Sequence, residues 1–87
     1  MKVEFGKAFA RDIVELPANV RQRVAQVVEC VMNAPNLQAV PNVKKLKGSP
    51  NAFRIRVGDY RVGFFLEGDQ VTFMRCLSRA AMYRGFP

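Results

Sequence analysis

Apolar side chains between residues 20 and 31 recur with the spacing of one helical face. These side chains are Val20, Val24, Val27, Val28 and Val31, which stand at positions i, i+4, i+7, i+8 and i+11. The opposite side carries polar side chains, namely Arg21, Arg23, Gln26 and Glu29. The pattern predicts an amphipathic helix that begins after Pro17, ends near Asn33 and packs its valine stripe on one surface.

Two shorter elements precede this helix. Residues 2–5 alternate between polar and apolar side chains, which predicts a short strand. Phe9, Ile13 and Leu16 recur at i, i+4 and i+7, so a short helix is expected over residues 7–15. The N-terminal half is therefore expected to contain one strand followed by two helices.

The C-terminal half alternates with the period of a strand. Residues 53–57 alternate apolar and basic side chains, and Gly58-Asp59 is typical of a tight hairpin turn. The chain returns over residues 60–66, turns again and continues as a last strand over residues 71–77. These features predict a three-strand antiparallel meander.

The remaining segments are expected to be connections. Residues 35–52 hold three prolines and a Gly-Ser-Pro turn, so we expect a loop that crosses back over the sheet. Residues 78–87 are expected to form a polar tail. The order β-α-α-β-β-β predicts one α+β domain over residues 1–87. In it, two N-terminal helices pack on one face of a small, mostly antiparallel sheet.

Basic side chains are concentrated in the second half of the chain. Fourteen Lys and Arg against seven Asp and Glu give a net charge of +7. Residues 1–43 hold five basic and four acidic side chains, a net +1, whereas residues 44–87 hold nine and three, a net +6. Such an uneven distribution of charge favours a polyanion or an acidic protein as the partner.

Composition disfavours several classes of function. The chain has no His, and Cys30 and Cys76 are not in a metal-ligand spacing, so no metal or other cofactor is expected. Two distant cysteines fit a reducing cytoplasm better than a disulfide framework. The sequence shows no secretory signal and no apolar run near the roughly 18 residues of a membrane span. A cytoplasmic location without membrane contact is therefore expected.

Four arginines are expected to gather on the face of the sheet that the helices leave free. Period-two geometry puts Arg54 and Arg56 on that face, and Arg61 on the neighbouring strand shares it. Arg79 follows the last strand closely enough to swing over the same face. Guanidinium groups that converge without a carboxylate suit a phosphodiester, because their forks match phosphate bidentately. An ordinary solvated strand face is the alternative.

Neighbouring residues extend this face. Gly63 would leave a gap between the arginines that could admit a phosphate. Phe65 could stack a base or form an apolar docking spot for a partner peptide. Tyr83 could act as an acid or a base, or simply pack. A loop that is expected to be solvated adds three lysines, Lys44, Lys45 and Lys47.

Three stretches of the sequence resemble one known family. They are Lys45-Leu46-Lys47-Gly48, the run FRIRVGDYRV from Phe53 to Val62, and the strand that leads to Arg79 and Tyr83. Together they resemble the RelE/ParE superfamily of toxins from bacterial type II toxin–antitoxin systems. Chain length and element order agree, so the resemblance spans essentially the whole chain. It implies one of two activities: RelE-like members cut mRNA in the ribosomal A site, and ParE-like members inhibit DNA gyrase.

The resemblance also implies a catalytic set. The positions that match the RelE branch are Arg54, Arg56, Arg61, Arg79 and Tyr83. In the implied transesterification, which uses no metal, Arg61 and Arg79 would stabilise charge on the phosphoryl oxygens. Tyr83 would orient the attacking 2′-hydroxyl or relay a proton, and Arg54 and Arg56 would hold phosphates. The expected RNA contacts are Lys44, Lys45, Lys47, Arg54, Arg56 and Phe65.

The chain departs from the RelE pattern in two places. The best-known members have lysines where Arg54 and Arg56 stand, and an arginine keeps its proton and cannot serve as a general base. Tyr83 and Tyr60 are the remaining titratable candidates, and a tyrosine with an ordinary pKa of about 10 is a slow base at neutral pH. The segment Ser78-Arg79-Ala80-Ala81 also replaces a histidine and a charged pair of many relatives. Both departures imply weakened or absent catalysis.

Three functions therefore stay open. The first is a ribosome-dependent mRNA endoribonuclease that inhibits translation until a cognate acidic antitoxin neutralises it in a toxin–antitoxin hetero-oligomer. The second is a ParE-type inhibitor of DNA gyrase. The third is a toxin disarmed at Ala80-Ala81, by drift or by introduced alanines, that acts as a binding module. The expected partners are an acidic antitoxin, the ribosome and mRNA.

Overall fold

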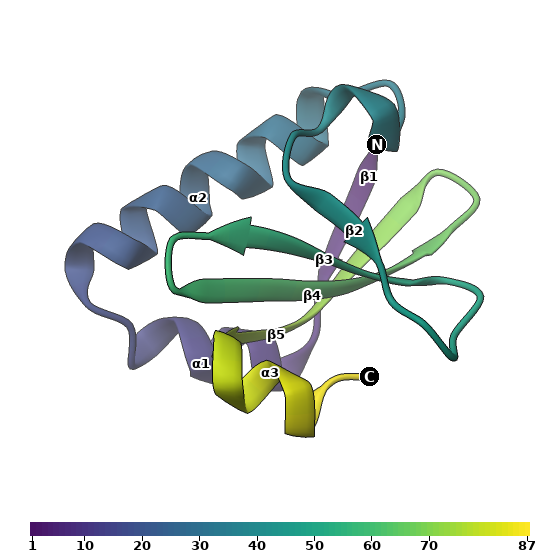
Figure 1. Ribbon diagram of the computed structural model, residues 1–87. Coiled ribbons are helices and arrows are strands. Elements are labelled where there is room, and N and C mark those ends of the chain that lie inside the picture. Colours follow the sequence, from purple (N-terminus) through teal and green to yellow (C-terminus); the bar gives the residue numbers. More distant parts are fainter.

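The computed structural model describes residues 1–87, which form five strands and three helices (Figure 1). In chain order these are β1 (Lys2–Phe5), α1 (Lys7–Val14), α2 (Ala18–Asn33), a short 3-10 turn (Leu37–Ala39), β2 (Val43–Lys45), β3 (Ala52–Val57), β4 (Tyr60–Glu67), β5 (Gln70–Ser78) and α3 (Arg79–Gly85). None of the helices combines the length and the apolar character that crossing a bilayer requires.

The five strands form one sheet in the order β1-β5-β4-β3-β2. β3, β4 and β5 are the antiparallel meander that the alternating pattern predicts, and β1 joins β5 as the one parallel pair. A bulge between β4 and β5 shifts their register at Gly63 and Phe64. The mostly antiparallel sheet with two N-terminal helices confirms the predicted fold class.

The main core lies between the sheet and the first two helices. α1 and α2 lie behind the sheet in Figure 1, and α3 lies in front of it. Val24 and Val31 of α2 are buried against Ile55 and Phe64 of the sheet, and the other valines of the stripe are half-buried beside them. The 3.6-residue periodicity therefore identified the buried face of α2 correctly.

The segment expected to be a polar tail is instead a helix, so that prediction is wrong. Ser78 caps α3, because its hydroxyl accepts a hydrogen bond from the Ala81 N–H at 3.3 Å. Met82 and Phe86 are buried against Ala52 on the front face of the sheet, where they form a second, smaller core. With only two apolar anchors in so short a segment, the sequence gives no clear helical period.

The loop expected over residues 35–52 also contains a strand. β2 pairs with β3 in the register Val43 to Ile55 and Lys45 to Phe53. A three-residue strand that carries two lysines has no alternation long enough to recognise. Its pairing extends the sheet beyond the meander and places Lys44 opposite Arg54, on the front face.

Candidate nucleic-acid interface

The β3–β4 hairpin brings three arginines together. Arg56 lies directly opposite Arg61 in the register, and Arg54 lies opposite Gly63. Because side chains alternate across a strand, all three project to the front face, away from the main core. This arrangement agrees with the placement predicted from the sequence.

Arg61 has the most constrained position of the three. It is buried to 9% relative exposure, and its Nη1 donates hydrogen bonds to the carbonyl oxygens of Gly58 at 2.8 Å and Tyr60 at 2.9 Å. These bonds hold the hairpin turn closed and leave the other guanidinium nitrogen atoms for a ligand. Arg61 is therefore both a structural residue and a candidate ligand for phosphate.

The charges around Arg61 are mainly positive. Burial lowers the pKa of Arg61, and the positive charges of Arg54, Arg56 and Arg79 lower it further, against a weaker opposing effect of Asp59. Four guanidinium groups therefore share one local field. An anion bound among them would relieve their mutual repulsion.

α3 supplies the fourth arginine and the tyrosine. The backbone N–H of Arg79 donates to the Asp59 carbonyl at 2.9 Å, which fastens the first residue of α3 to the hairpin turn. The Arg79 side chain is exposed. Tyr83, one turn further along, is 76% exposed. Both side chains are therefore accessible to a ligand on the front face.

A cavity of about 450 Å³ adjoins the arginines on this face. β2 and the loop after it line it with three lysines, Lys44, Lys45 and Lys47. Arg54, Tyr83 and Phe86 complete much of the wall. The lysines are exposed, as expected for a solvated loop, but the fold also sets them across a cavity from Arg54. The lysines and the arginines thus form one basic surface, which we call the basic face.

The gap predicted at Gly63 is absent, and two aromatic candidates, Phe65 and Tyr60, are less accessible than Tyr83. Gly63 leaves no gap for a phosphate, since a Cβ there would come within 2.7 Å of the Phe86 ring, which fills the space. Phe65 is half-buried, with its ring centroid 5.4 Å from that of Phe86, so the helix partly covers it. Tyr60 packs against the main core behind the sheet. Tyr83 is therefore the one tyrosine on the basic face.

Other chemical groups lie away from this face. Burial, together with the charge of Asp12, raises the pKa of the Cys76 thiol to about 11, so its thiolate is scarce at neutral pH. Arg75 forms an ion pair with Asp12 at 2.8 Å. No group of three or more His, Cys, Asp or Glu is placed to hold a metal ion.

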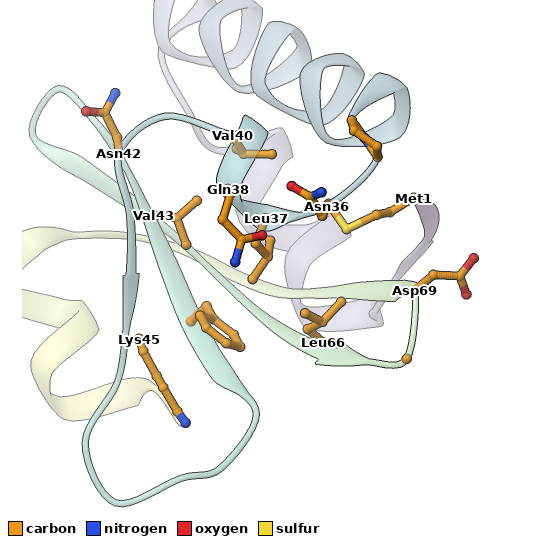
Figure 2. Close-up of a pocket in the computed structure, with 13 residues that line it drawn as sticks. Met1, Asn36, Leu37, Gln38, Val40, Asn42, Val43, Lys45, Leu66 and Asp69 are labelled. Carbon is orange, nitrogen blue, oxygen red and sulfur yellow. The ribbon is translucent and has the colours of Figure 1, made fainter.

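Another cavity, of about 650 Å³, lies between the segment after α2 and the sheet. Figure 2 shows Leu37, Val43 and Leu66 around its centre and Asp69 at its edge. No arginine lines it. Its chemistry suits a nucleic-acid phosphate less well than that of the basic face.

Comparison with known proteins identifies the family. No protein-family model matches the chain. It is, however, 40% identical over 88 residues to Toxin RelE3 of Methanocaldococcus jannaschii, with all of both chains covered. The chain belongs to the RelE toxin family. The resemblance stated from the sequence is thereby confirmed.

Solved structures agree with the RelE assignment. The toxin of a RelB–RelE antitoxin–toxin complex from Methanococcus jannaschii is 37% identical with a TM-score of 0.83, covering 97% of this chain and 99% of that one. An archaeal RelE–RelB complex from Pyrococcus horikoshii matches at a TM-score of 0.72 and 23% identity, over 90% and 93% of the two chains. The second similarity extends the likeness in fold to a more distant sequence.

Proposed function

We propose that this RelE-family chain is the toxin of a type II toxin–antitoxin system and cuts mRNA on the ribosome. The observation that carries the proposal is the convergence of Arg54, Arg56 and Arg79 around the buried guanidinium of Arg61. None of the four forms an ion pair, since the chain's one salt bridge joins Asp12 and Arg75. A phosphodiester supplies the anion that such a cluster lacks.

The proposed reaction is an internal transesterification. The ribose 2′-oxygen forms a bond to the adjacent phosphorus, the bond from phosphorus to the 5′-oxygen breaks, and a 2′,3′-cyclic phosphate and a 5′-hydroxyl result. Arg61 and Arg79 would stabilise the charge that builds on the phosphoryl oxygens, because donors already in place cost no reorganisation. Arg54 and Arg56 would hold neighbouring phosphates. The lysines of the basic face, Lys44, Lys45 and Lys47, would bind the RNA backbone.

Proton transfer is the weakest part of the catalytic set. The 2′-hydroxyl must lose a proton and the leaving 5′-oxygen must gain one. Tyr83 carries the one phenol on the basic face, and its exposure allows it to reach a bound ribose. Ribosomal groups or water would therefore share the work. This need favours a reaction that depends on the ribosome.

An acidic antitoxin is the proposed inhibitor. The M. jannaschii relative at 37% identity was solved as an antitoxin–toxin complex. In this chain the net +6 of residues 44–87 gives an acidic segment a complementary surface. Covering Lys44, Arg54 and Tyr83 would block RNA and neutralise the toxin within a hetero-oligomer.

Arg79→Ala is the sharpest test of the proposed function. The Arg79 side chain is exposed, whereas Arg61 also holds the hairpin turn, so its removal would mix folding with chemistry. We expect Arg79→Ala to slow cleavage of ribosome-bound mRNA about a hundredfold, the usual cost of one charge-stabilising donor. Arg11→Ala, an exposed arginine on α1, is the control with the same loss of charge and should cleave normally.

The other outcomes identify the alternatives. Intact mRNA together with inhibited DNA supercoiling would replace the proposal with a ParE-type gyrase inhibitor. Ribosome binding without cleavage would favour a binding-only toxin, the alternative that the single exposed Tyr83 supports best. Equal cleavage by Arg79→Ala and Arg11→Ala would contradict the role of the arginine cluster.

A further inference from the structure

A smaller cavity lies between α2 and β3, on the far side of the hairpin from the basic face. Its volume is about 210 Å³, below the roughly 300–1,000 Å³ of pockets for drug-sized ligands. β2 pairs with β3 only as far as Ile55, so the next residues of the strand edge, Arg56 and Val57, line this cavity. Its size suits a fragment such as one nucleobase or ribose.

The walls of this cavity combine three kinds of group. Arg23 of α2 supplies a guanidinium group, and no carboxylate lines the cavity. Gln26 and Asn42 supply side-chain amides, which pair well with the edges of bases. The apolar part includes Val27, Val40 and Ile55. A positive group, amides and an apolar wall are what a nucleotide requires for its phosphate, base edge and base face.

The hairpin turn connects this cavity to the basic face. Arg23 Nη1 lies 2.9 Å from the position that a Cβ on Gly58 would occupy, and Arg61 Nη1 donates to the Gly58 carbonyl at 2.8 Å. Two guanidinium groups from opposite layers of the fold thus meet at one turn residue. Arg56 borders both sites, because it lines the cavity at the strand edge while its side chain projects to the front face with Arg61. An RNA strand that passes the turn would therefore stay in contact with positively charged side chains.

We propose that this cavity is a second RNA-binding site that holds one nucleotide flanking the scissile bond. The base lies against Val27, which is half-buried, and Arg23 binds its phosphate. The choice of RNA as the ligand rests on the proposed function. The cavity itself is a separate feature of the fold and can be tested separately.

Cys30 provides a direct measure of whether the cavity is occupied. Its side chain lines the cavity and is half-buried, whereas Cys76 is buried and its raised pKa keeps it unreactive. We expect a short oligouridylate, without ribosomes, to slow alkylation of Cys30 by iodoacetamide severalfold in the full chain. Arg23→Ala should abolish this protection. Arg21→Ala, exposed on the same helix and outside the cavity, should retain it.

Two results would overturn the second site. One is alkylation of Cys30 at the same rate with and without oligouridylate. The other is equal protection by inorganic phosphate or by a poly-glutamate peptide, which would mean a plain anion site or an acidic protein partner. Ribosomal cleavage without protection refutes the second site and leaves the proposed function. Protection without ribosomal cleavage refutes the proposed function and the position beside a scissile bond, and leaves the cavity as an RNA-binding site.

Discussion

Asp12 shows how one side chain completes an interrupted sheet edge. β1 stops pairing with β5 at Phe5 and Phe73, and α1 begins two residues later. The Asp12 carboxylate takes over, since it accepts hydrogen bonds from the Cys76 N–H at 2.9 Å and from Arg75 Nε at 2.8 Å. The carboxylate thereby satisfies the Cys76 N–H, which no neighbouring strand reaches on that side of β5. It also pairs Arg75, which lies outside the arginine cluster of the basic face.

Asp12→Ala should lower the free energy of unfolding by about 2–3 kcal/mol, because it leaves a partly buried N–H and a guanidinium without partners. Asp12→Asn keeps an acceptor for the Cys76 N–H and should cost less. Glu15→Ala, which removes an exposed acid at the end of the same helix, is the matched control. Urea denaturation measures all three. An equal loss in Asp12→Ala and Glu15→Ala would show that the bridge contributes nothing.

At the level of elements, α3 decides the shape of the basic face. Phe86 occupies the space over Gly63, Met82 packs on Ala52, and the helix is fastened at its start by the Arg79 N–H. Only a few apolar side chains hold it, so it should be the least stable of the three helices. The positions of Arg79 and Tyr83 depend on this small second core.

Met82→Ala should loosen α3 without unfolding the sheet. The side chain is almost fully buried, and its loss removes much of the second core while the thirteen-residue main core is untouched. Amide hydrogen exchange should therefore speed up in residues 82–86 and stay unchanged in β3 and β4. Tyr83→Ala, which truncates an exposed side chain of the same helix, should leave exchange as it is. Exchange that rises uniformly through the chain would contradict the idea of an independently docked helix.

The elements differ in how far the sequence could predict them. The valine stripe of α2 and the alternation of residues 53–57 span enough periods to define a buried face, and both predictions are confirmed. The shared face of Arg54 and Arg56 follows from that alternation alone, and Arg61 joins them through the register of the β3–β4 hairpin. The error at Gly63 arose because the residue that fills its space, Phe86, is distant in sequence and follows an unpredicted helix. Long-range packing of this kind leaves no local pattern.

On the scale of the whole molecule, the two faces of the sheet have different tasks. α1 and α2 cover the back face, which contains the main core, whereas α3 lies on the front face (Figure 1). The front face also carries the arginines and lysines of the basic face. The charge excess seen in the sequence is thus concentrated on one surface. The placement of the charges, and not only their sum, should determine the affinity for RNA.

Two triple variants with the same net charge test whether the placement of the charges or their sum determines the affinity for RNA. One variant changes Lys44, Lys45 and Lys47 to Gln, and the other changes Lys2, Lys7 and Arg11 to Gln. Each lowers the net charge from +7 to +4. All six side chains are exposed, so neither variant should unfold. The first should reduce the slope of log affinity against log salt for single-stranded RNA by about 2, because each phosphate that a lysine no longer neutralises lowers that slope by about 0.7. The second should leave the slope nearly unchanged, because β1 and α1 lie away from the basic face. Equal slopes in the two variants would mean that RNA affinity depends on the total charge alone. That result would show that the basic face is not the RNA-binding surface.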